Sequence, residues 1–343
     1  MVNIKNHLCI LLCFLMLLPV LTACSNTQSN NETTTESTNE TEYVQLVVDK
    51  SEPICDSKNL KLLAITSSFG LNTTQFLYNI AVAEGFAPEN VVIGRLYASG
   101  CTLKKHVEYA PDKPLYWYSK ISGDPEKVKT PGVWVTVKEE GYGTLLDALQ
   151  DEDWDIIFIQ QSAAQSPIAD SYGNYLDQLM GIVHKYKTNS NAKFIWNMTW
   201  AYQSDSKETV FTDTFHSDQE LMYQTLVDVL KDKIVPRTDF HAIIPSGTAI
   251  QNARTSFFGD KLTRDTYHLN NLGRVISGYT LFSVITGKKL TSINLNEPIM
   301  CTDDRTPIIL LDEDKDVIME AVNNAIASPF EITSSQYKQN KGE

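Results

Sequence analysis

Short apolar runs recur along the chain and are separated by longer segments in which apolar residues return every three to four positions. Five such runs have the length and the apolar composition of buried strands. They are Leu60–Ile65, Val91–Tyr97, Asp155–Ile159, Phe194–Thr199 and Phe240–Ile244.

The segments between and after these runs have the periodicity of amphipathic helices. The predicted helices are Thr73–Ala83, Tyr172–Tyr186, Asp218–Lys231, Asn271–Ile285 and Asp314–Ile326. Strands that alternate with helices of this length form a parallel sheet with helices on both faces. In such sheets, active sites lie beyond the carboxyl ends of the strands.

Two segments do not follow this alternation. Residues 104–140 are rich in aromatic residues amid proline and glycine, and this length predicts an insertion near the site. Residues 288–335 form a C-terminal extension that contains the last predicted helix. The predicted domain therefore spans residues 44–335, and residues 336–343 are a tail.

The N-terminus has the pattern of an export signal. Lys5 precedes an apolar run, Leu8–Leu21, that is shorter than a typical membrane-spanning helix. The run ends in Leu21-Thr22-Ala23-Cys24, which resembles a bacterial lipobox. This resemblance implies removal of residues 1–23 and lipidation of Cys24. Residues 24–43 are mostly Ser, Thr, Asn, Gln and Glu, which predicts a flexible tether at a bacterial cell surface.

Composition limits the partners and the cofactors. A net charge of −13 offers no basic stripe, which argues against a nucleic-acid partner. No Cys-x-x-Cys or His-x-x-x-His spacing indicates a metal site, and we expect no cofactor. Of the cysteines outside the signal and the lipobox, Cys55 and Cys301 could pair or, like Cys101, remain thiols.

A candidate nucleophile follows the first predicted strand, in Thr66-Ser67-Ser68-Phe69-Gly70. A serine on a strand-to-helix turn can be exposed beside backbone N–H groups that stabilise an oxyanion. Serines at such turns are also common helix caps. We favour Ser68, with Ser67 as its rival.

Candidate oxyanion donors follow the next two strands. Gly100 comes after the second strand, and Gln160 and Gln161 come after the third. The backbone N–H of the glycine and an amide side chain could both donate to an oxyanion. Either feature could instead be ordinary turn geometry or a polar strand end.

A candidate base follows the fifth strand, in Asp265-Thr266-Tyr267-His268. An acid three residues before a histidine can hold Nδ1–H, which leaves Nε2 to accept a serine proton. Asp213 and His216 have the same spacing, but they lie before a predicted helix rather than after the last strand. We therefore favour His268 and interpret His216 as a surface or substrate-side residue.

In order along the chain, these elements resemble the sequence blocks of the SGNH (GDSL-like) hydrolase superfamily, specifically a bacterial lipoprotein family within it. The resemblance covers about residues 60–285 and includes Met198–Gln203, Gly247–Asn252 and Leu262–Arg274. It implies a flavodoxin-like three-layer α/β/α sandwich with a five-stranded parallel sheet.

The resemblance also implies a serine esterase. Its triad would be Ser68, Asp265 and His268, and the N–H groups of Ser68 and Gly100 would hold the oxyanion. Two features depart from the superfamily pattern. Thr66-Ser67 replaces the usual Gly-Asn or Gly-Asp, and Gln160-Gln161 stands where Gly-x-Asn-Asp is expected, which leaves the amide donor open.

The expected substrate is a small acyl ester, with acetyl on a carbohydrate as the specific hypothesis. Trp200 and Tyr202 follow the fourth strand and could line the substrate site, although most such aromatics are core residues. The alternative is a non-catalytic sugar-binding lipoprotein. In both cases the membrane is contacted only through the N-terminal lipid.

Overall fold

The computed structural model describes residues 53–55, 58–138, 142–301 and 303–338. The predicted signal peptide, the lipidation site Cys24 and the tether lie outside these residues. Within them, no helix has the length and apolarity that crossing a bilayer requires.

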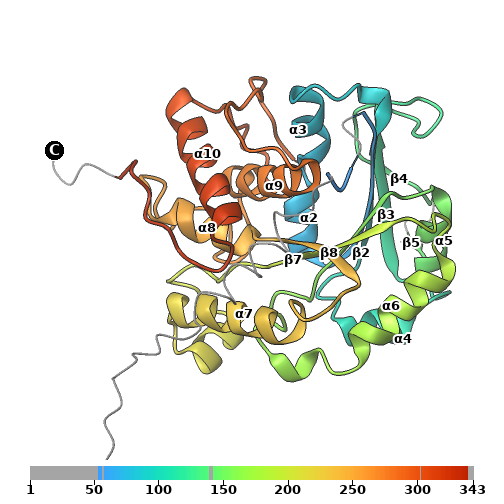
Figure 1. Cartoon of the computed structure of the whole chain (residues 1–343), viewed down its shortest axis with the longest axis horizontal. Helices are drawn as coiled ribbons and strands as arrows, with labels where there is room; N and C mark the ends of the chain where they lie inside the picture. Colours follow the sequence, from blue (N-terminus) through green and yellow to red (C-terminus); the bar gives the residue numbers. More distant parts are fainter. Residues whose placement is uncertain (1–52, 56–57, 139–141, 302, 339–343) are drawn as a thin grey trace, which may run out of the picture. The chain divides into compact units, whose positions relative to one another are not determined.

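Five parallel strands form the centre of the sheet (Figure 1). In spatial order they are β2 (Val91–Tyr97), β1 (Leu60–Thr66), β6 (Ile156–Ile159), β7 (Lys193–Asn197) and β8 (Phe240–Ile244). This order is the flavodoxin-like 2-1-3-4-5 arrangement. The predicted five-stranded parallel sheet is confirmed.

Antiparallel strands within and just after the aromatic insertion extend this sheet beyond β2. β3 (Tyr116–Ser122) pairs with β2, and the short β4 (Val135–Thr136) and β5 (Tyr142–Gly143) both pair with β3. Along β3, buried Tyr116 and Tyr118 alternate with exposed Trp117, as expected for a strand with one covered face.

Helices cover both faces of the sheet and complete the predicted three layers (Figure 1). One face carries α2 (Ser68–Thr74), α3 (Leu77–Ala83), α8 (Ser246–Arg254), α9 (Asn271–Thr286) and α10 (Asp312–Ala327). The other face carries α4 (Leu103–Tyr109), α5 (Leu145–Asp151), α6 (Tyr175–Tyr186) and α7 (Gln219–Lys233). Three short helical turns, Pro88–Asn90, Ala169–Ser171 and Val210–Thr214, lie in the connections.

The first predicted helix differs from the structure in a way that matters for the site. Instead of one helix over residues 73–83, α2 begins at Ser68 and a break at Phe76 separates it from α3. The chain therefore turns into a helix directly after β1, and Ser68 is the first helical residue.

No disulfide bond joins Cys55 to Cys301 in the described part of the chain. The Cys301 thiol is instead buried within hydrogen-bonding distance of Asn271 and Asp303, with Sγ 3.0 Å from an oxygen of each. Cys101 is also a buried thiol, beside Gly100.

Candidate active site

The turn from β1 into α2 separates the two candidate serines. Ser67 occupies the N-cap position of α2 with an extended backbone and no side-chain capping bond, and it is only 1% exposed, whereas Ser68 is half-buried. Gly70 allows this tight turn, because a Cβ there would collide with the side chain of Thr66. The structure therefore favours Ser68 as the accessible hydroxyl, although both serines border the same cavity.

A cavity of about 440 Å³ lies at the carboxyl ends of the parallel strands. It brings together Ser68 after β1, Gly100 after β2 and His268 from the loop before α9. These residues are up to 200 positions apart in sequence, and the parallel topology alone places them at one edge. Ser68 and His268 face this cavity without a direct hydrogen bond between them in the described structure.

Asp265 holds His268 through two hydrogen bonds. His268 Nδ1 lies 2.8 Å from Asp265 Oδ2, and the backbone N–H of His268 donates to Oδ1 at 2.8 Å. Thr266 adopts a left-handed φ of 73°, which turns the chain tightly enough for both contacts. With Nδ1 bound to the carboxylate, Nε2 is the ring nitrogen left to exchange a proton with a substrate or a serine.

The surroundings of this pair favour a neutral imidazole. Burial lowers the pKa of His268 below its usual 6.5, and the charges of Arg264 and Arg274 lower it further, against the raising effect of Asp265. Burial would raise the pKa of Asp265, but the bonds and charge of His268 and the charge of Arg264 outweigh it, and the pKa falls. At neutral pH the pair is therefore a carboxylate and a neutral base.

Aromatic rings connect His268 to the turn that carries Ser68. Phe69, the residue after Ser68, meets the His268 ring edge-on at 5.8 Å and stacks on Trp200 at 4.1 Å with an interplanar angle of 7°. Trp200 Nε1–H donates to the backbone oxygen of Tyr267 at 2.8 Å. Trp200 is fully buried and does not border the cavity, so the expectation that it lines a substrate site is wrong; Tyr202 does border the cavity.

Neither predicted glutamine reaches the cavity. Gln160 donates to Ser67 Oγ at 3.3 Å and accepts from Asn197 at 3.0 Å. Gln161 accepts from the backbone N–H groups of Leu103 and Ser162 and donates to Ser171. Both amides are committed to buried structural bonds, and the proposed oxyanion role does not fit their positions.

The glutamine of this loop that borders the cavity is Gln165. The chain after β6 turns back at residues 162–166, where the N–H groups of Gln165 and Ser166 both donate to the carbonyl of Ser162. This turn carries Gln165 to the rim of the cavity. No pattern in the sequence favours this residue over Gln160 and Gln161 at the strand end.

Gly100 borders the cavity as predicted, with φ of 54°. A Cβ at this position would meet no other atom within 4 Å. The left-handed backbone of the turn, rather than a close approach by other groups, is therefore what requires glycine here.

Asn72 is a site residue that the sequence did not suggest. It lies one turn after Ser68 in α2 and borders the cavity, and its Oδ1 accepts the backbone N–H of Leu269 at 2.8 Å. This bond joins the helix that begins at Ser68 to the residue that follows His268.

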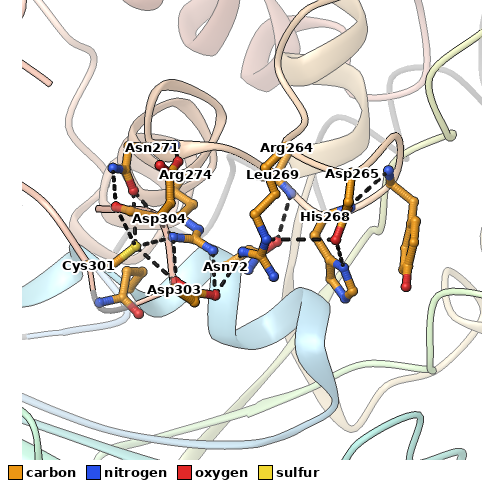
Figure 2. A network of polar contacts seen from close by, with 12 residues as sticks. Asn72, Arg264, Asp265, His268, Leu269, Asn271, Arg274, Cys301, Asp303 and Asp304 are labelled. Carbon is orange, nitrogen blue, oxygen red and sulfur yellow. Dashed lines mark hydrogen bonds and ion pairs between the residues drawn. The ribbon is translucent and has the colours of Figure 1, made fainter. Parts of the chain in front are cut away.

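A second unexpected group is the ionic network beside the loop that carries Asp265 and His268 (Figure 2). The carboxylate of Asp303, in the C-terminal extension, pairs with two guanidinium groups. Its oxygens lie 2.8 Å from a nitrogen of Arg264 and 2.9 and 3.0 Å from nitrogens of Arg274. Arg264 Nε also lies 3.7 Å from Asp265. The extension thereby holds a cation next to the acid of the predicted triad.

The alternative acid and histidine pair lies elsewhere. His216 is exposed, has a left-handed φ of 53° and does not border the cavity. Asp213 Oδ1 accepts from Thr212 at 2.9 Å. Position along the fold, which favoured His268, therefore agrees with the geometry.

Comparison with known proteins defines the family. Residues 61–301 match the model of the domain of unknown function DUF4886, and the chain belongs to this family. A DUF4886 family protein from Bacteroides uniformis is 32% identical with a TM-score of 0.65, covering 81% of this chain and 98% of that one.

Two further solved structures have a TM-score of 0.39. A proposed SGNH hydrolase from Slackia heliotrinireducens is 14% identical, covering 66% of this chain and 100% of that one. A proposed GDSL-like lipase from Parabacteroides merdae is 9% identical, covering 68% and 99%. No match was found among curated proteins.

Proposed function

We propose that this protein is a serine hydrolase of the SGNH type that cleaves a small acyl ester. The observation that carries the proposal is the neutral, carboxylate-held His268 on the same cavity as the half-buried Ser68. A serine hydroxyl needs such a base to become a nucleophile.

In the proposed reaction, Nε2 of His268 takes the proton of Ser68 as Oγ attacks the ester carbonyl. The resulting oxyanion collapses, the alcohol leaves with that proton, and an acyl-enzyme remains. Water then attacks the acyl-enzyme with His268 again as the base, which releases the acid and restores Ser68.

The oxyanion would be held by the backbone N–H groups of Ser68 and Gly100. We assign the third donor to the amide of Gln165, because it borders the cavity whereas Gln160 and Gln161 do not. Such preorganised donors act where charge develops in the transition state.

We further propose a carbohydrate as the alcohol part of the ester, with acetyl as the acyl group. The cavity wall combines the aromatic side chains of Tyr97, Tyr202 and Tyr267 with the polar side chains of Thr102 and Glu208. Aromatic faces and hydroxyl or carboxyl partners together suit a sugar. A lipid anchor at Cys24 would place this activity at the cell surface.

The test is hydrolysis of p-nitrophenyl acetate by the purified domain and its variants. We expect Ser68→Ala and His268→Ala each to lose the catalysed hydrolysis. Ser67→Ala and His216→Ala should hydrolyse the ester as the wild-type protein does. Activity that survives Ser68→Ala and is lost in Ser67→Ala would transfer the role of nucleophile to Ser67. An inactive wild-type protein that binds acetylated sugars would favour the non-catalytic alternative.

A further inference from the structure

Three aromatic residues lie opposite one another on neighbouring strands. The sheet register pairs Tyr97 of β2 with Trp117 of β3, and Trp117 with Tyr142 of β5. Residues directly opposite in antiparallel pairs point to the same face with Cβ atoms about 4.5–5.5 Å apart. The three side chains therefore form one row across the edge of the sheet.

The row lies on the face of the sheet that carries α2, and two of its three rings are exposed to solvent. The neighbouring Tyr116 and Tyr118 point to the opposite face, where they bond His106 of α4 and Asp151 of α5. Trp117 and Tyr142 are 47% and 48% exposed, and their ring centroids lie 5.0 Å apart with an angle of 42°. In the described part of the chain these are among the most exposed large apolar side chains.

The row is continuous with the candidate active site, because Tyr97 borders the cavity. The next row on the same face is Arg95, Ser119 and Thr136. The guanidinium of Arg95 is stacked on Trp134 at 3.3 Å, whereas Ser119 is half-buried and Thr136 is exposed. Two open rings thus lie next to hydroxyl groups rather than within a wide apolar surface.

We propose that Trp117 and Tyr142 are a binding platform for the sugar rings of a polysaccharide whose acylated unit enters the cavity. A pyranose ring has a face of C–H groups that packs on an aromatic ring, and its edge hydroxyls need polar neighbours. A lipid or protein partner would need a larger contiguous apolar area. The identity of the acyl ester rests on the proposed function, but binding to the platform does not.

Binding is tested with Ser68→Ala protein, so that no ester is consumed. The probes are soluble acetylated xylan, acetylated glucomannan and acetylated pectin, measured by affinity electrophoresis. Tryptophan fluorescence provides a second measurement, because Trp154, Trp196 and Trp200 are buried and Trp134 is covered by Arg95.

We expect at least one probe to bind and to change the fluorescence. Trp117→Ala should weaken binding by about tenfold, as truncation of a central aromatic contact does. Trp117→Phe should keep most of the affinity and lose the fluorescence change. Leu221→Ala, at a 44% exposed apolar residue of α7, is the matched control and should bind as the parent does.

Catalysis separates this proposal from the proposed function. In otherwise wild-type protein, Trp117→Ala should lower the ratio of polymer to p-nitrophenyl acetate turnover by about tenfold through KM, and Leu221→Ala should keep the ratio. If no probe binds, or binding is unchanged in a Trp117→Ala, Tyr142→Ala double variant, the platform is refuted. Binding that depends on Trp117 in a protein without esterase activity would uphold the platform and refute the proposed function.

Discussion

At the scale of single residues, the charge around His268 sets the pH at which the proposed base is available. Burial and the charges of Arg264 and Arg274 lower the pKa of this imidazole. A base must be neutral to accept the serine proton, so activity should be lost as pH falls through the lowered pKa. The acid limb of kcat/KM should accordingly have its midpoint below 6.5.

Replacing Arg264 with glutamine tests this electrostatic account. The substitution removes a cation that disfavours the protonated ring, so the acid limb should move to higher pH. The measurement is kcat/KM for p-nitrophenyl acetate between pH 4 and 9. Arg237→Gln removes an arginine paired with Asp177 and Asp239, away from the cavity, and should leave the limb in place. If the acid limb of the kcat/KM profile stays at the same pH in Arg264→Gln, the charge of Arg264 does not set the pKa of His268.

The oxyanion donor gives a second prediction for single residues. Gln165→Ala should lower kcat by about 10²–10³ if the amide holds the oxyanion. Gln161→Ala should instead lower the free energy of unfolding by roughly 1–3 kcal/mol, because it leaves buried N–H groups without an acceptor. Steady-state kinetics and urea unfolding of both variants distinguish the roles. Full kcat in Gln165→Ala would show that the two backbone N–H groups act without this amide.

At the scale of elements, the site depends on how α2 meets the loop before α9. The bond from Leu269 N–H to Asn72 Oδ1 joins these elements across the cavity. Asn72→Ala leaves that buried N–H unpaired, which should cost about 1–3 kcal/mol of stability. The loop that carries His268 should also lose its alignment with Ser68, so kcat should fall more than KM rises.

Asn72→Asp retains an acceptor for Leu269 and should recover most of the stability. The added carboxylate near His268 should also shift the acid limb of the pH profile upward. Equal unfolding free energies for Asn72→Ala and the wild-type protein would show that this bond contributes nothing to the attachment of the loop.

The elements also show which parts of the structure the sequence could predict. The limits of the second and fifth strands were predicted to the residue, because buried parallel strands are runs rich in apolar residues. Helix α8 was not predicted, since Ser246–Arg254 is rich in small and polar residues that are nonetheless almost all buried. Periodicity cannot reveal a helix that is covered on all sides.

The same limit applies to the site. Asp265 and His268 are close in sequence, so their contact was predictable from a local pattern. Gln165 and Asp303 come to the cavity through a loop reversal and a distant extension, which depend on tertiary packing. Residue spacing carries no information about such contacts, and neither of the glutamines singled out from the sequence, Gln160 and Gln161, borders the cavity.

At the scale of the whole described domain, an ion pair with a buried arginine joins the C-terminal extension to the edge of the sheet that carries the candidate site. The side chain of Arg274 is 1% exposed and is paired with Asp303, whose side chain is 52% exposed. Burial would raise the pKa of Asp303, but Cys301, Arg274 and Arg264 together lower it to about 2. The ion pair should therefore stabilise the fold at pH values above the ordinary carboxyl pKa.

Asp303→Asn should lower the free energy of unfolding by about 1–3 kcal/mol at pH 7, because a buried guanidinium loses its carboxylate. The exposure of Asp303 places the effect toward the lower end of that range. A carboxyl group whose pKa is depressed on folding contributes stability that is lost as pH falls from 3.8 toward about 2. The difference between the variant and the wild-type protein should therefore shrink over that interval.

Urea unfolding at pH 7 and at successively lower pH measures this difference. Asp312→Asn is the matched control, since the side chain of Asp312 is fully exposed and lies 3.6 Å from Lys315. The control should unfold as the wild-type protein does. If the difference in unfolding free energy between Asp303→Asn and the wild-type protein stays constant down to pH 2, the loss comes from packing. If the difference shrinks, the charge of Asp303 is what holds the extension at the site.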